Sequence, residues 1–148
     1  MEKRIMRVML ALAGVAIISS FAVAQRSGGG NPLSGTSWQL VKFQGPDERT
    51  FTPDDKSKYT ITFGTNGRVT ARVDCNRASS KWSAKGNNEL HFGSWSRTSA
   101  KCGAGSLHDQ IVQEGGAVHK FEIKDGRLFL SGMAGGGYYE LERMPQKR

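Results

Sequence analysis

Short segments in which apolar and polar side chains alternate constrain the fold of this chain more than any other feature. Residues 59–63 alternate in this way, and so do residues 69–73. The Asn66-Gly67 pair between them can adopt the positive φ values that a tight hairpin needs. Asp125-Gly126 separates two further segments of the same kind. Alternation with period two, interrupted by turn dipeptides, predicts antiparallel β-hairpins rather than helices.

The same pattern along the chain predicts a meander of short strands. Beyond the first hairpin, strands are expected at residues 37–43, 81–83, 90–92, 121–123, 128–130 and 138–142. Closing such a meander into a barrel leaves few exposed strand edges, which otherwise invite aggregation.

One segment departs from the strand pattern. Ser106 and Asp109 have the spacing of a helix capping box, and Leu107, Ile111 and Val112 then fall on one face of a helix. A helix of about two or three turns does not persist alone in water, so it needs to pack on the sheet. The expected fold is therefore mainly β (α+β). It is a small antiparallel β-barrel, half-open or closed, or a meander, with one short helix packed on it.

The first 24 residues have the features of an export signal. Three basic residues among the first seven precede an uncharged, mostly apolar run, and Ala22-Val23-Ala24 supplies the small residues that signal peptidase accepts. An anchoring helix is the alternative, but the run is shorter than the about 20 apolar residues that a membrane span requires. Cleavage is expected after Ala24. No cysteine precedes Cys75, so no lipid-attachment cysteine is expected. Cleavage removes the apolar run, so no membrane span is expected in the product, which is predicted to be periplasmic or secreted.

The chain is expected to contain one folded domain, because its 148 residues match the usual size of a single domain. Residues 1–24 are assigned to the cleaved signal and the glycine-rich residues 25–32 to a flexible leader. Residues 33–143 form the domain, and residues 144–148 form a loose tail.

Cys75 and Cys102 are the only two cysteines. In an exported protein an even number of cysteines indicates a disulfide bond. A metal pair and a catalytic thiol are the alternatives. Metal sites usually show closely spaced cysteines or histidines, whereas His91, His108 and His119 are scattered, and no base is placed beside either thiol. No metal site, cofactor or catalytic residue is therefore expected.

Several motifs together carry a family resemblance. Residues 33–40 (Leu-Ser-Gly-Thr-Ser-Trp-Gln-Leu) resemble the opening of the META/HslJ-like domain family (DUF306). Asp74-Cys75-Asn76-Arg77 is similar to the family's Gly-Cys-Asn-Arg motif, although Asp74 stands where small residues are usual, and Thr98 to Cys102 is similar to its Thr-x-x-x-Cys element. The family-motif residues are Gly35, Trp38, Asn76, Arg77 and Thr98.

The resemblance implies a small, exported, β-rich domain with envelope and stress-response roles and without catalytic residues. Family members are often lipoproteins, and the missing lipid-attachment cysteine departs from that pattern. The residues themselves predict a structural role for the Cys75-Asn76 pair in a turn. Asparagine tolerates left-handed backbone and can hydrogen-bond its own chain.

Positive charge is concentrated in residues 68–101. The whole chain carries a formal net charge of +8, and removal of the signal leaves 18 bases against 12 acids, a net of +6. Residues 68–101 hold two acids and seven bases: Arg68, Arg72, Arg77, Lys81, Lys85, Arg97 and Lys101. One interpretation is a solvated surface that only aids solubility. The other interpretation is a face for an anionic envelope partner such as a lipid head group, a polysaccharide or an acidic protein. Nucleic acid would also match the charge, but export argues against it.

The leading hypothesis is a non-enzymatic envelope protein that acts by binding, with a role in stress response. The alternatives are a secreted or periplasmic inhibitor of an enzyme such as a protease, and a carrier barrel for a small ligand, although so small a barrel is expected to leave little room for a cavity. Trp38, Trp82 and Trp95 are expected to pack in the core or at the barrel mouth. If Trp95 lies at an open barrel end beside Arg97, the two would contribute to a small-molecule pocket.

Overall fold

The computed structural model describes residues 30–86, 88–114, 118–133 and 137–145. The predicted signal, all but the last three residues of the predicted leader, and residues 146–148 of the predicted tail lie outside the described residues.

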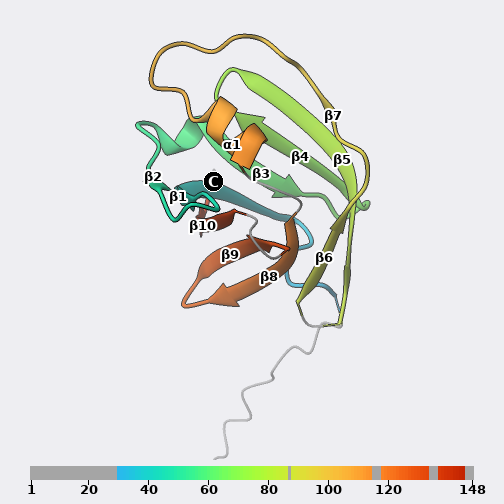
Figure 1. The fold of residues 1–148 in the computed structure, drawn as a ribbon. Helices are drawn as coiled ribbons and strands as arrows, with labels where there is room; N and C mark the ends of the chain where they lie inside the picture. Colours follow the sequence, from blue (N-terminus) through green and yellow to red (C-terminus); the bar gives the residue numbers. More distant parts are fainter. Residues whose placement is uncertain (1–29, 87, 115–117, 134–136, 146–148) are drawn as a thin grey trace, which may run out of the picture.

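Eight antiparallel strands form a closed barrel (Figure 1). In chain order they are β1 (Thr36–Gln44), β3 (Tyr59–Phe63), β4 (Arg68–Val73), β5 (Asn76–Lys85), β6 (Glu89–Phe92), β8 (Val118–Lys124), β9 (Arg127–Gly132) and β10 (Tyr138–Arg143). The ring closes because the last strand, β10, pairs with the first, β1. The prediction of a small mainly β barrel with one helix is confirmed, and of the alternatives left open the closed barrel is the one that forms.

Three short elements lie outside the ring and have no counterpart in the sequence prediction. Strand β2 (Thr50–Phe51) pairs with β1, and strand β7 (Ser96–Arg97) pairs with the beginning of β5. A 3-10 helix, η1 (Lys56–Lys58), precedes β3. Strand β5 is also longer than the predicted residues 81–83, because its first half consists of small and polar residues that carry little strand signal.

The turns follow the dipeptides that indicated them, with one correction. Gly67 and Gly126 have positive φ, as the predicted hairpins require. The β4–β5 turn consists of Asp74 and Cys75, and the residue with left-handed backbone is Asp74, with φ of 56°. The placement of Asn76 in that turn was wrong. Asn76 is the first residue of β5, and its side chain bonds to a distant loop instead.

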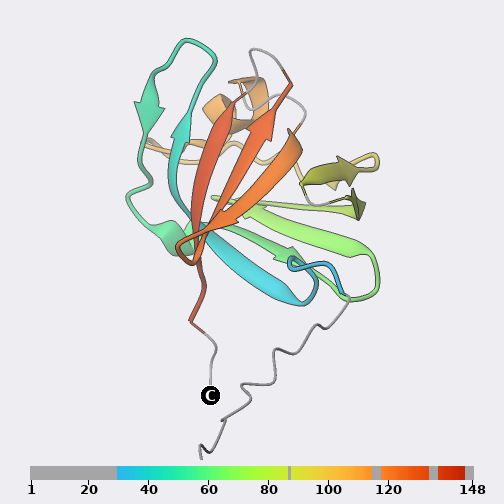
Figure 2. The ribbon, with the colours of Figure 1, turned by 90° about the horizontal axis from the view of Figure 1, so that it is seen from below.

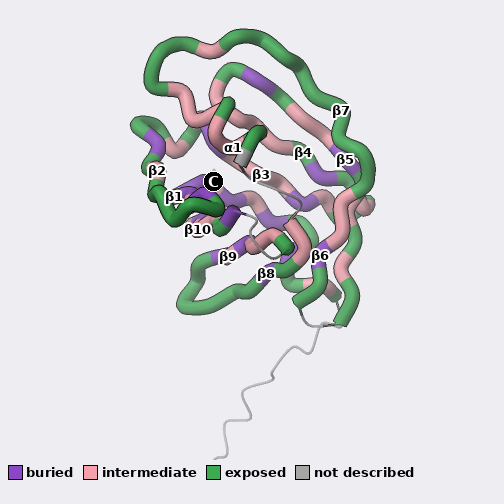
Figure 3. The backbone as a smooth tube through the Cα atoms, viewed as in Figure 1, coloured by how far each residue is buried: buried purple, intermediate pink, exposed green. Residues whose placement is uncertain are grey.

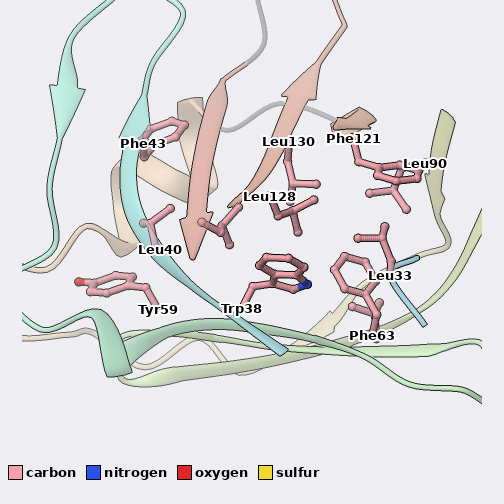
Figure 4. Packing of buried hydrophobic residues seen from close by; sticks show 12 residues of the cluster. Leu33, Trp38, Leu40, Phe43, Tyr59, Phe63, Leu90, Phe121, Leu128 and Leu130 are labelled. Carbon is pink, nitrogen blue, oxygen red and sulfur yellow. The ribbon is translucent and has the colours of Figure 1, made fainter. Parts of the chain in front are cut away.

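The barrel is packed with large side chains at one end. Trp38, Phe63, Leu90 and Leu128 are fully buried there, and Leu33 from the segment before β1 joins them (Figure 4). Figure 3 shows the buried positions along the inside of the barrel, with the exposed positions on its outer face and loops. Burial of these side chains excludes water from this end, which supplies the main driving force for folding.

The short helix α1 (His108–Glu114) lies at the other end of the barrel (Figure 2). The buried Tyr59 hydroxyl accepts a hydrogen bond from the Leu107 N–H at 2.9 Å, which fixes the entry to the helix. Leu107 and Ile111 pack against the core, as the predicted apolar face requires. The prediction fails for Val112, which is 39% exposed at the barrel mouth.

The start of α1 also differs from the predicted capping box. Ser106 Oγ accepts a hydrogen bond from the His108 N–H at 3.2 Å, and the helix begins at His108 rather than at Leu107. Asp109 Oδ1 lies 2.9 Å from His108 Nδ1 instead of capping the chain. The glycines expected to end the helix, residues 115 and 116, lie outside the described residues.

Candidate functional site

Asn76 joins the start of β5 to the loop that leads to α1. Its Nδ2 donates a hydrogen bond to the Ala100 carbonyl at 2.8 Å, and its Oδ1 accepts from the Thr98 hydroxyl and from the Ala100 N–H, both at 2.8 Å. Beside it, Cys75 and Cys102 form a disulfide with a Cα–Cα distance of 5.6 Å. The buried Asn76 side chain is thus engaged by the chain itself and is not available to a ligand.

Arg77 and Thr98 exchange hydrogen bonds next to Asn76. The Arg77 N–H donates to Thr98 Oγ1 at 3.0 Å, and the Thr98 N–H donates to the Arg77 carbonyl at 2.9 Å. The backbone of Arg77 is therefore held in place. Its side chain is exposed on the outer face of the barrel.

The remaining family-motif residues, Gly35 and Trp38, support the packed end. Gly35 has φ of 72° and donates its N–H to the Phe63 carbonyl at 2.8 Å. The Trp38 indole N–H donates to Thr36 Oγ1 at 2.7 Å, and the Arg143 guanidinium lies 4.8 Å from the Trp38 ring centroid. These contacts lie within the chain and are structural in kind.

The outer face of β4 and β5 brings four of the seven predicted bases together. In the antiparallel register Arg68 lies opposite Lys81, and Arg72 lies opposite Arg77. Directly opposite residues on neighbouring strands have Cβ atoms about 5 Å apart, so each pair places like charges side by side. We call Arg68, Arg72, Arg77 and Lys81 the basic face.

A groove of about 600 Å³ lies along this side of the barrel. Arg72, Arg77 and Arg97 line it, and Arg72 Nε donates to the Asp74 carbonyl at 2.9 Å. Ala71, Ala78 and Met144 also line it, and hydroxyl groups come from Ser57, Thr60, Thr62, Thr70, Ser79, Ser96 and Thr98. The groove therefore combines cationic donors with hydroxyl donors, which is the chemistry that binds oxyanions.

The bases of the predicted segment differ from Lys42, Lys56 and Arg127 in that they lack an acidic partner in the described part of the chain. Within the described residues, none of the seven forms an ion pair with a carboxylate. By contrast, Lys42 and Arg127 both bind Glu140, and Lys56 binds Glu142 at 3.0 Å. Two hydrogen bonds lower the pKa of Glu142: the one from Gln39 has the larger effect, and the one from Lys56 the smaller.

The other three bases of the predicted segment lie outside the two opposed pairs. Lys85 ends β5, where Glu89 lies opposite it in the register. Lys101 lies in the loop beside the disulfide, and Arg97 lies on β7 at the edge of β5. Of these three, Arg97 lies beside the basic face, because it lines the groove together with Arg72 and Arg77.

The three histidines do not lie in one place, although His91 Nε2 is 3.6 Å from Glu89 Oε2. The His91 and His119 rings meet edge to face, with centroids 5.8 Å apart, whereas His108 lies on α1. Among the described residues no group of three or more His, Cys, Asp or Glu side chains is arranged to hold a metal ion. In the same part of the chain, no helix combines the length and apolar character needed to span a bilayer.

A cavity of about 410 Å³ opens at the α1 end of the barrel. The expectation that so small a barrel leaves little room for a cavity was wrong. Trp95 and Arg97 both line the cavity, as they would in the small-molecule pocket considered from the sequence. Trp95 is 37% exposed, and its ring centroid lies 5.2 Å from that of Phe92. Of the other tryptophans, Trp38 is fully buried and Trp82 packs edge-on against Phe63.

These features define a small antiparallel barrel. At one end, the Cys75–Cys102 disulfide and the hydrogen bonds of Asn76 hold the loop that leads to α1 against the start of β5. The chain belongs to the META domain family, whose model matches residues 31–146. No curated protein matches the sequence significantly.

Two solved structures share the fold. A protein from Burkholderia xenovorans studied by NMR is 17% identical, with a TM-score of 0.60 over 77% of this chain and 85% of that one. A crystal structure of a DUF4847 family protein from Bacteroides vulgatus is 16% identical, with a TM-score of 0.56 over 81% of this chain and 100% of that one. At these identities the likeness concerns the fold alone.

Proposed function

We propose that this protein is an exported, non-enzymatic binding protein of the cell envelope with a role in stress response. Its basic face contacts the phosphate of an anionic lipid head group. The observation that carries the proposal is the pairing of Arg68 with Lys81 and of Arg72 with Arg77 across two strands, without a carboxylate partner among the described residues.

Like charges placed opposite each other on neighbouring strands destabilise a sheet by about 0.2–1 kcal/mol a pair. Some other bases of this barrel lie beside acids, as Lys42 and Arg127 do beside Glu140, although Lys124 lies opposite Arg127 in the β8–β9 register. A bound anion would offset the repulsion on the basic face. Solubility alone does not require like charges in opposed positions, because net charge serves solubility wherever it is placed.

Guanidinium groups bind phosphate through two parallel hydrogen bonds, and hydroxyl groups add further donors. The groove supplies both, with Arg72 and Arg77 beside the hydroxyls of Thr70 and Ser79. A phosphate-bearing head group matches this chemistry in charge and in hydrogen bonding.

Export and the stress role are supported by separate observations. The basic and then apolar start of the chain fits a cleaved signal, and the Cys75–Cys102 disulfide fits an oxidising compartment. The stress role follows from the family resemblance. A mass measurement of secreted material is expected to show a chain that begins at Gln25 with both cysteines oxidised. A deletion strain is expected to grow more slowly under heat or envelope-active compounds, and unchanged growth under both would contradict the stress role.

Vesicle binding tests the basic face. Vesicles of phosphatidylglycerol mixed with phosphatidylcholine would be sedimented with the wild type and with Arg68→Gln/Lys81→Gln. The matched control, Lys120→Gln/Lys124→Gln, removes the same charge from exposed positions of β8. Each base near a lipid surface contributes about 1 kcal/mol, so the basic-face variant is expected to bind about 30-fold more weakly, and the control is expected to bind almost normally.

Salt provides the second criterion. Binding of the wild type is expected to fall steeply as ionic strength rises, because screening shortens the range of exposed charges to about 8 Å at physiological salt. Equal losses in the two variants would show that only net charge matters and would overturn the assignment of the face. Binding that does not respond to salt would overturn the electrostatic proposal itself.

A further inference from the structure

We propose that the α1 end of the barrel is a binding site for a small amphipathic anion, namely an alkyl carboxylate whose chain enters the cavity and whose head group meets Arg97. This site borders the basic face, because Arg72 and Arg77 belong to that face and also line the cavity. Its test varies Arg97 and the alanines of the cavity, so it does not depend on the function proposed above.

The cavity exists because the inward side chains change size along the barrel. At the packed end, Phe63 and Trp82 fill the space between β3 and β5. At the α1 end, Ala71 of β4 lies directly opposite Ala78 of β5, and both line the cavity. Two opposed alanines leave empty the volume that aromatic side chains occupy elsewhere, and α1 lies over the resulting space (Figures 1 and 2).

The lining of the cavity is mainly apolar. Its walls come from several strands and from the helix, and include Ile61, Val73, Phe92, Leu130 and Ile111. A volume of about 410 Å³ lies within the range of about 300–1,000 Å³ that small-molecule sites occupy. Burying an alkyl chain here removes apolar surface of both ligand and protein from water, which favours binding.

Arg97 is placed to receive a negative charge at the cavity mouth. It lies opposite Ala78 in the β5–β7 register, and directly opposite residues point to the same face of a sheet. Ala78 faces the cavity, so Arg97 lies on the cavity side, and it is among the lining residues. It is exposed and forms no ion pair with a described carboxylate.

The other polar groups at the mouth favour an anion over a cation. Arg72 and Arg77 also border the cavity, and no Asp or Glu is among its described lining residues. The nearby Asp109 is engaged with His108 Nδ1. Burial raises the pKa of Tyr139 well above its usual range, so this lining phenol stays neutral and does not repel a carboxylate.

Titration with decanoate, and in parallel with the uncharged decanol, tests the proposal. The full mature chain is used, and binding is followed by calorimetry and by the fluorescence of Trp95, with Trp95→Phe to identify its signal. Saturable binding of decanoate, tighter than that of decanol, is expected. In amide spectra of the wild type, the shifts are expected at Ala71, Ala78 and Ile111 rather than at Glu122 and Lys124 of β8, which do not line the cavity.

Two kinds of variant separate the head group from the chain. Arg97→Gln is expected to weaken decanoate binding about tenfold or more and to leave decanol binding unchanged, because it removes one charge-assisted hydrogen bond. Lys101→Gln, the same charge change at a residue that does not line the cavity, is the control and is expected to change neither. Ala71→Leu and Ala78→Phe fill the cavity and are expected to abolish binding of both ligands.

Thermal unfolding establishes whether each variant with a filled cavity is folded. If Ala78→Phe does not fold, the test of cavity filling uses Ala71→Leu alone. Three results would overturn the proposal: no saturable binding to the wild type, unchanged binding to a folded filled variant, or equal affinity for decanoate and decanol with no effect of Arg97→Gln. Arg68→Gln/Lys81→Gln is expected to bind decanoate normally, so failure of the vesicle experiment and failure of this one are distinguishable.

Discussion

Replacing Arg77 with glutamate is expected to make the folded protein more stable while weakening its binding to anionic vesicles. Arg77 lies opposite Arg72, and its backbone is held by Thr98 through hydrogen bonds that do not involve its side chain. The substitution therefore changes one exposed charge and leaves the local backbone contacts in place. It converts a repulsive cross-strand pair into an attractive one.

The magnitude follows from the energies of such pairs. A like-charge pair costs and an opposite-charge pair contributes about 0.2–1 kcal/mol, so the reversal is expected to raise the free energy of unfolding by about 1 kcal/mol. For a domain of about 100 residues this corresponds to a rise of about 4 °C in Tm. Arg77→Gln removes the repulsion without adding an attraction and is expected to give about half of that rise.

Urea unfolding at low and at high salt measures the effect. In about 1 M salt the range of electrostatic interactions shrinks to about 3 Å, so most of the gain of Arg77→Glu is expected to vanish. Arg127→Glu is the matched control, because Arg127 pairs with Glu140, and its reversal is expected to destabilise the protein by a similar amount. A destabilised Arg77→Glu variant at low salt, or a gain that persists undiminished in high salt, would refute the reasoning.

Three other substitutions test the remaining contacts. Cys75→Ser/Cys102→Ser is expected to lower the free energy of unfolding by about 3–4 kcal/mol, because the disulfide closes a loop with a separation of 27 residues, and denaturant titration measures the loss. Asn76→Ala is expected to cost about 2–3 kcal/mol in the same assay, since the buried Asn76 amide loses its three hydrogen bonds to the Thr98 hydroxyl and to the N–H and carbonyl of Ala100. Glu142→Gln is expected to flatten the fall of Tm between neutral pH and pH 3. In the wild type, the pKa of Glu142 is lower in the folded state than its ordinary value of 4.5. The Glu142 carboxylate therefore stabilises the fold at pH values above 4.5, and this contribution disappears as the pH falls through the folded-state pKa.

The local parts of the fold were predictable because local residues determine them. The glycines in the β3–β4 and β8–β9 turns, Gly67 and Gly126, supply the backbone angles that their hairpins need. The long alternating segments became strands with nearly the predicted bounds. Closure of the barrel was not predictable, because it depends on pairing between β1 and β10, which are remote in sequence and carry no mutual signal in a single chain.

The candidate sites were predictable in part. Counting charges found the bases, and alternation placed Arg68 and Arg72 outward, but the opposed pairs depend on the β4–β5 register. A two-residue turn at Asp74 and Cys75 determines that register, and assigning Asn76 to the turn concealed it. The size of the cavity was underestimated for another reason. Its presence depends on which inward positions face one another around the ring, and that is a property of closure.

The ring is joined unevenly at the two places where distant parts of the chain meet. β1 and β10 pair along most of their length, whereas β6 and β8 pair at Glu89 and Lys120 and through the hydrogen bond from the Phe121 N–H to the Asn88 carbonyl. Local opening follows the least costly route. Local opening is therefore expected to start at the β6–β8 junction, and to convert the closed ring into one open sheet in which the other strand pairings stay intact.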